Sequence, residues 1–82
     1  MLTRYIHEAM ERAHYEIIKD AEPYYGEIPE LPGVWASGVT LEQCRRNLTD
    51  ALEDWLLFSV AKSLPIPPMG GVVIKPPEAI AS

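Results

Sequence analysis

The first helical signal in the chain lies at its N-terminus. Apolar residues recur there at steps of three and four, the spacing that places side chains on one face of a helix. The positions that share this face are Leu2, Ile6, Ala9, Met10 and Ala13. Thr3 is the candidate N-cap. The pattern predicts a short amphipathic helix over residues 2–13.

A stronger helical signal begins at VTLEQC, residues 39–44. Thr40 and Gln43 stand three residues apart as a capping box, in which the two side chains satisfy backbone N–H groups at a helix start, and Val39 and Cys44 occupy the positions of a hydrophobic staple. The apolar stripe that follows is Leu41, Cys44, Leu48, Ala51, Leu52, Trp55, Leu56 and Val60. We expect a long helix, beginning at Leu41, whose apolar face covers a sheet.

Leu57 and Phe58 lie off this stripe. They add apolar surface beyond what one small sheet needs, which predicts a second buried contact near the end of the helix. Prolines at 65, 67 and 68 then prevent the helix from continuing.

Between the two helices the pattern changes to short extended runs bounded by turn residues. HYEIIKD, residues 14–20, predicts a first strand with Tyr15 and Ile17 on one face. YYGEIPEL, residues 24–31, predicts a second strand. This strand is interrupted late, because Pro29 has no N–H to donate to a neighbouring strand.

Two further strands complete the predicted sheet. LPGV, residues 31–34, fits a type II turn, in which Pro32 presets φ and Gly33 supplies the positive φ of the third position. The turn leads into VWASG, residues 34–38, as the third strand of an antiparallel meander. VVIK, residues 72–75, is bounded by glycine and proline and predicts an edge strand, within this sheet or paired with a neighbouring subunit.

These elements predict one small α+β domain. With 82 residues, of which 48% are hydrophobic and 23% charged, the chain has the composition of a folded protein and the length of a single core. We divide the domain, residues 1–82, into an N-terminal helix at 1–13, a core at 14–76 and a tail at 77–82. A core of this size gains from self-association, so we expect a homodimer or a higher homo-oligomer.

Acidic residues outnumber basic ones by twelve to seven, which gives a net charge of −5. The basic residues are scattered apart from Arg45 and Arg46, so direct binding to nucleic acid is not expected. An acidic surface suits a basic protein partner, and it serves solubility equally well. The longest apolar run, residues 55–61, is too short to span a membrane, and no signal-peptide pattern precedes it. We therefore expect a cytoplasmic protein.

The candidate metal ligands have a structural explanation that the pattern favours. Asp50, Glu53 and Asp54 have the spacing of one helical face, but they lie opposite the apolar stripe and indicate a solvated surface. His7 and Glu11 also share a helical face, but two ligands do not make a site.

The single cysteine, Cys44, excludes an internal disulfide. It follows a capped helix start, where the helix dipole favours a reactive thiolate, yet its place on the apolar stripe indicates a core residue. We therefore expect no enzyme, and no catalytic residue, metal or cofactor. The candidate interface residues are instead Tyr24, Tyr25, Trp35, Leu57 and Phe58. The three aromatic anchors among them, Tyr24, Tyr25 and Trp35, could equally belong to the core.

One stretch of the chain resembles a known family. Residues 20–56 read DAEPYYGEIPELPGVWASGVTLEQCRRNLTDALEDWL, and PIPP follows at residues 65–68. The IPELPG turn, the strand of small residues, the T-x-E helix start and the NLTDAL segment occur in the order that is typical of the HicB-like antitoxins of bacterial and archaeal toxin–antitoxin pairs. The resemblance implies a partial ribonuclease-H-like β-β-β-α-β fold, to which the helix at residues 1–13 is an addition.

The resemblance also implies a role. HicB-like domains bind a small basic HicA-like toxin that cleaves messenger RNA, and they silence it by covering its active face. Many of them carry a DNA-binding module after this domain. The segment after Gly71 is too short for one, so no direct DNA binding is expected.

The sequence departs from the family at two positions, one just before its second helix and one within it. Val39 replaces the usual acidic residue before Thr40, and Cys44 stands where the family tends to have alanine. Two alternatives to the antitoxin function remain open. One is a solitary homo-oligomeric domain without a toxin partner, and the other is a metal-dependent nuclease that uses Asp50, Glu53 or Asp54.

Overall fold

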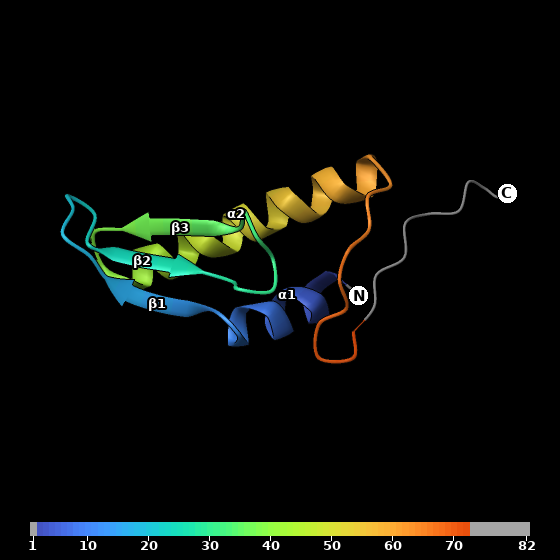
Figure 1. Ribbon diagram of the computed structural model, residues 1–82, viewed down its shortest axis with the longest axis horizontal. Helices are drawn as coiled ribbons and strands as arrows, with labels where there is room; N and C mark the ends of the chain where they lie inside the picture. Colours follow the sequence, from blue (N-terminus) through green and yellow to red (C-terminus); the bar gives the residue numbers. More distant parts are fainter. Residues whose placement is uncertain (1, 73–82) are drawn as a thin grey trace, which may run out of the picture.

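The computed structural model describes residues 2–72 of the chain and shows a small α+β fold (Figure 1). The elements are α1 (Leu2–Glu11), β1 (His14–Ile17), β2 (Tyr24–Glu27), β3 (Trp35–Gly38) and α2 (Leu41–Ala61). This order confirms the predicted succession of a helix, three strands and a long helix.

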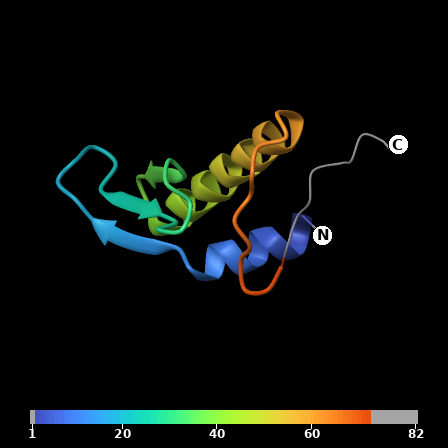
Figure 2. The same cartoon turned by 45° about the vertical axis from the view of Figure 1, so that its right-hand side comes forward.

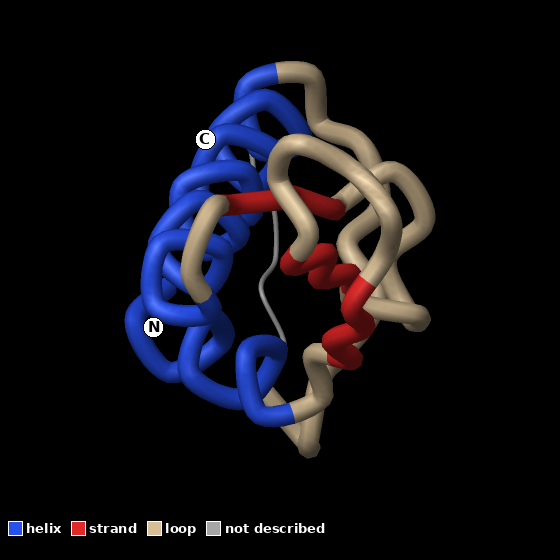
Figure 3. Tube along the Cα trace, turned by 90° about the vertical axis from the view of Figure 1, so that its left-hand side faces the viewer, coloured by secondary structure: helices blue, strands red, loops and turns tan. Residues whose placement is uncertain are grey.

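The three strands form an antiparallel sheet in the order β1-β2-β3. In its register His14 lies opposite Glu27, and Glu27 lies opposite Trp35. The helices lie on one side of the strands, as the end-on view in Figure 3 shows. The sheet therefore has an inner face toward α2 and an outer face that no described element covers.

Small residues let α2 approach the inner face closely. A Cβ atom at Gly38 would lie 2.5 Å from the backbone nitrogen of Cys44 on α2, and one at Gly26 would lie 3.3 Å from the Sγ atom of Cys44. Ala36, between them on this face, is also buried. Ile17 shares the face by register, but it stays 76% exposed because no described residue covers that end of β1.

The start of α2 confirms the predicted capping box. The Gln43 backbone N–H donates to Thr40 Oγ1 at 3.0 Å, and the Gln43 side-chain oxygen accepts from the Val39 N–H at 3.0 Å. The second bond reaches one residue further back than the usual capping box does. Val39 is 57% exposed, so the predicted staple contact buries little of it.

A second part of the core lies beyond the sheet, between α1, α2 and two irregular segments. Ile28, Leu31 and Val34 reach it from the loop between β2 and β3, and Ile66 and Met69 from the coil after α2. That coil runs from the end of α2 down to α1 (Figure 2). The Tyr5 hydroxyl on α1 donates to the Pro67 carbonyl, which fastens the coil to the helix.

Several predicted boundaries move. The helix α1 begins at Leu2, so Thr3 lies inside it and the N-cap prediction for Thr3 is wrong. The strand β2 ends before Pro29, as expected, and the turn is present: the Val34 N–H donates to the Leu31 carbonyl at 3.0 Å, with Gly33 at φ 95°. Of the predicted strand at 72–75 only Val72 is described, in a bridge with Met69, and the predicted tail at 77–82 lies outside the described residues.

Candidate functional site

An aromatic pair stands on the outer face of the sheet. Tyr25 on β2 and Trp35 on β3 are diagonal neighbours, because Tyr25 lies opposite Ser37 and Trp35 lies opposite Glu27. Their ring centroids are 5.9 Å apart and the ring planes are inclined by 27°, which is a stacked arrangement. Trp35 is 55% exposed, so one large aromatic surface is open to a partner.

Carboxylates surround this pair. Glu27 accepts a hydrogen bond from the Tyr25 hydroxyl at 3.2 Å, Glu16 lies opposite Tyr25 in the register, and Glu22 accepts from the Ser37 hydroxyl at 2.6 Å. Partial burial of Tyr25, the bond to Glu27 and the charges of Glu27 and Glu16 together raise the pKa of the Tyr25 phenol. The outer face is therefore both aromatic and acidic.

A hollow of about 370 Å³ adjoins the aromatic pair. Tyr25, Glu27 and Trp35 line it from the sheet. Its other walls come from the loop between β2 and β3, by Ile28, Pro29, Leu31, Pro32, Gly33 and Val34. The turn at residues 31–34, with Gly33 at positive φ, holds this loop beside the strands. The LPGV motif that predicts the turn therefore also forms a wall of the hollow.

The structure separates the five predicted interface residues. It brings Tyr25 and Trp35 together on the outer face, whereas Tyr24 faces α2, because neighbouring strand residues point to opposite faces. Leu57 and Phe58 are 60% and 56% exposed on α2, away from the sheet face. The second buried contact predicted near them is not made within the described residues.

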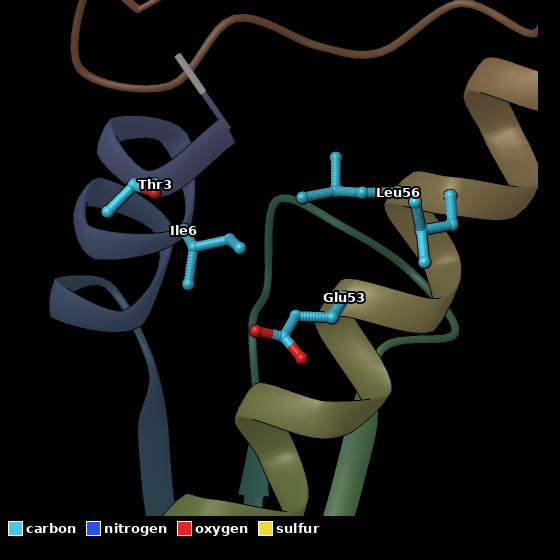
Figure 4. A pocket seen from close by; sticks show the side chains of 5 residues that line it. Thr3, Ile6, Glu53 and Leu56 are labelled. Carbon is cyan, nitrogen blue, oxygen red and sulfur yellow. The ribbon is translucent and has the colours of Figure 1, made fainter.

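Leu57 does line a hollow between the two helices (Figure 4). The hollow, of about 250 Å³, is bounded by Thr3 and Ile6 on α1 and by Glu53, Leu56 and Leu57 on α2. Figure 4 shows Ile6 pointing from α1 toward the helix that carries Glu53 and Leu56. Its lining is mainly apolar, with a single carboxylate.

The acidic and histidine candidates stay at the surface. Asp50, Glu53 and Asp54 are exposed on α2, and the exposed His7 and Glu11 approach each other at 3.1 Å. Within residues 2–72, no three side chains of the types His, Cys, Asp and Glu gather as a metal site would require. The described helices also include none with the length and apolar character needed to cross a membrane.

Cys44 is fully buried against the sheet. Its Sγ donates to the Ala36 carbonyl at 3.6 Å. Burial, with a smaller contribution from the charge of Glu22, raises the pKa of the Cys44 thiol. A nucleophilic cysteine needs the opposite shift, so the structure supports the prediction of a core residue.

Sequence reasoning missed the carboxylates of the outer face. Glu16, Glu22 and Glu27 lie on β1, on the turn after it and on β2, and only the strand register brings them around one aromatic pair. The available signal was the alternation within β1 and β2, which places Glu16 and Glu27 on the same face as Tyr25 once the pairing is known.

Comparisons with known proteins give a family and a solved structure. The model of the UPF0150-like family matches residues 4–67. The crystal structure of TTHA0281 from Thermus thermophilus is similar to this chain, with 62% sequence identity and a TM-score of 0.86, over 89% of this chain and 96% of that one. No curated protein matches the chain. The family match begins within α1, so it includes most of the helix that the sequence suggested was an addition.

Proposed function

The chain belongs to the UPF0150-like family, and we propose that it is an antitoxin-like binding module that neutralises a small basic mRNA-cleaving toxin. The resemblance of residues 20–56 to HicB-like antitoxins suggests this role. The order β1-β2-β3-α2 supports it, because a partial ribonuclease-H-like domain has the same order. The proposed partner is a HicA-like protein, and the proposed compartment is the cytoplasm.

The outer face of the sheet is the observation that carries this proposal. No described element covers it, and it holds the stacked Tyr25 and Trp35 beside Glu16 and Glu27. Exposed aromatic residues are common anchors of protein interfaces, and carboxylates attract a partner of opposite charge. With a net charge of −5, the whole chain also steers a basic protein toward it.

The mechanism is occlusion rather than catalysis. The sheet face binds the toxin over its active face, so RNA no longer reaches the catalytic groups. One antitoxin chain then blocks one toxin chain. The RNA-cleaving activity of the toxin falls in proportion to the added antitoxin until the two proteins are equimolar. Inhibition that is complete far below one equivalent would contradict this mechanism.

The test starts from the host cell. The chain, tagged after Ser82, is purified at low salt, and small basic proteins that copurify are identified, expressed separately and assayed for RNA cleavage. We expect one of them to cleave RNA and to be inhibited at a ratio of one to one. Copurified proteins without RNA cleavage, or cleavage that the chain does not suppress, would contradict the proposal.

Charge reversal locates the binding face. Glu16→Lys with Glu27→Lys changes the outer face, whereas Asp50→Lys with Asp54→Lys makes the same change in net charge on the exposed side of α2. We expect the first pair to weaken inhibition by about tenfold or more and the second pair to leave it close to the wild-type level. If both pairs of substitutions weakened inhibition equally, inhibition would depend on the net charge of the chain and not on the outer face.

A solitary homo-oligomeric domain is the second candidate function. Leu57 and Phe58, both more than half exposed on α2, favour it, because two large apolar side chains side by side on a helix are typical of an interface. The two candidates are compatible if self-association uses α2 and the toxin binds the sheet.

A further inference from the structure

We propose that the hollow beside Tyr25 and Trp35 binds an arginine side chain of the basic partner. This inference rests on the proposed function for the partner's charge, and it adds the chemical group that is recognised. The following contacts favour an arginine over other basic groups.

The aromatic pair supplies a surface for a planar cation. Trp35 is 55% exposed while its ring stacks on Tyr25, so the position of the indole is fixed and one side remains accessible. A guanidinium group stacks on such a ring and is attracted by its π-electrons. The ammonium group of a lysine has no plane with which to stack, and its stronger hydration opposes its transfer to the ring.

Glu27 supplies the negative charge at the same place. It lies opposite Trp35 in the sheet, and one of its carboxylate oxygens accepts from the Tyr25 hydroxyl. No basic side chain within residues 2–72 forms an ion pair with it. The fork of N–H groups on a guanidinium matches a carboxylate held in this way, and the charge of nearby Glu16 adds to the attraction.

The hollow also has apolar walls for the stem of the side chain. Pro29 and Pro32 line it next to Trp35. The methylene groups of an arginine pack along such surfaces while the charged end reaches the carboxylate. The aromatic ring, the acid and the apolar wall thus occur in one hollow.

Two other hollows lined by residues within the described range 2–72 lack this combination. The hollow bounded by Tyr15, Leu41, Glu42 and Arg45 contains a cation of its own, which repels a basic ligand. The hollow between α1 and α2 has a carboxylate but no aromatic ring among its lining residues. Among these three hollows, the one on the outer sheet face is the match for an arginine.

The test compares two synthetic peptides on the full chain labelled with ¹⁵N. One peptide contains four arginines separated by serines, and the other contains four lysines at the same positions. We expect the arginine peptide to shift the Trp35 indole signal and the amides of β2 and β3, and to bind about fivefold or more tightly than the lysine peptide. Equal affinities, or no shift at the outer face, would overturn the inference.

Matched variants assign the interaction. Trp35→Ala and Glu27→Gln should each weaken binding of the arginine peptide by about fivefold. Trp35→Phe keeps an aromatic ring and should bind the peptide more tightly than Trp35→Ala does. Phe58→Ala removes an aromatic side chain that is exposed to nearly the same extent, 56%, and Asp50→Asn removes a remote charge. Both should bind like the wild type. If Trp35→Ala folds and binds the peptide unchanged, the assignment is wrong.

The inference and the proposed function fail separately. If the chain inhibits a toxin at one to one but does not bind the arginine peptide, the arginine site is wrong and the antitoxin function stands. If the peptide binds at Trp35 and no toxin is inhibited, the site stands and the antitoxin function is wrong.

Discussion

A cysteine near a helix start can be either reactive or structural, and the environment of Cys44 decides which. The thiol is fully buried against β3 and donates to the Ala36 carbonyl. Burial raises its pKa above the ordinary 9.0, so in the folded protein the thiol stays protonated to a higher pH than in the unfolded chain. Burial is the largest cause of this raised pKa, and the charge of Glu22 acts in the same direction.

We predict that native Cys44 reacts with a disulfide reagent at pH 8 about tenfold or more slowly than the unfolded chain does. Because its pKa is raised, the thiol also lowers the stability of the fold as the pH rises above 9.0, where the unfolded chain ionises first. An Ala61→Cys, Cys44→Ala variant, with its thiol at an exposed position, is the control and should react quickly. Fast reaction of the native wild type would contradict the burial.

The long helix α2 owes its start to local hydrogen bonds. Thr40 Oγ1 accepts from the Gln43 N–H, and the Gln43 side chain accepts from the Val39 N–H. These bonds satisfy backbone groups that have no partner in the first turn of a helix. They also fix where α2 begins, with its N-cap Thr40 two residues after the last residue of β3, Gly38.

We predict that Thr40→Ala lowers the free energy of unfolding by about 1 kcal/mol. Thr49→Ala is the matched control, because its hydroxyl donates to the Arg45 carbonyl within the same helix and caps nothing. Alanine is the better helix former there, so the control should be neutral or slightly stabilising. Urea denaturation followed by circular dichroism measures the free energy of unfolding of both variants. Equal losses of stability in the two variants would contradict the capping role of Thr40.

At the scale of the whole molecule, the described part leaves apolar surface uncovered. Leu57 and Phe58 are 60% and 56% exposed at adjacent positions of α2, on a chain with a small core. Burial of such side chains against a second copy adds to the stability that one small core supplies. Self-association therefore remains a prediction, with α2 as its surface.

We predict that the wild type self-associates in sedimentation velocity at micromolar concentrations, and that Leu57→Gln with Phe58→Gln sediments as a monomer of about 9.2 kDa. Val39→Gln with Leu41→Gln changes two side chains of similar exposure, one just before α2 and one at its first residue, and should leave the association intact. A wild type that stays monomeric, or a loss of association in both double variants, would contradict α2 as the interface.

Several features of the site follow from particular residues that sequence patterns could not place. Tyr24 and Tyr25 are adjacent and chemically alike, and the packing of α2 on Gly26 and Gly38 decides that Tyr25 joins Trp35 on the outer face. Tyr5 is fully buried, although it lies outside the apolar stripe predicted for α1, because the coil after α2 provides a carbonyl for its hydroxyl.

By itself the sequence determined the features that depend on neighbours a few residues away. These are the helical period and capping box of α2, the turn at Gly33, the interruption of β2 before Pro29 and the three short strands. The capping box, the turn and the interruption at Pro29 are fixed by hydrogen bonds or backbone angles within a few residues, whereas the helical period and the strands follow from the local pattern of apolar and polar residues. Local residue chemistry is therefore sufficient to predict them.

Only the tertiary structure decided which residues meet across the molecule. The register of three strands gathers Glu16, Glu27, Tyr25 and Trp35 on one face, and the packing of α2 leaves Leu57 and Phe58 outside the core. Such contacts join different strands, as Glu16 with Tyr25 and Glu27 with Trp35, and a shift of one residue in strand pairing would move every side chain to the opposite face. The binding face is for this reason a property of the fold.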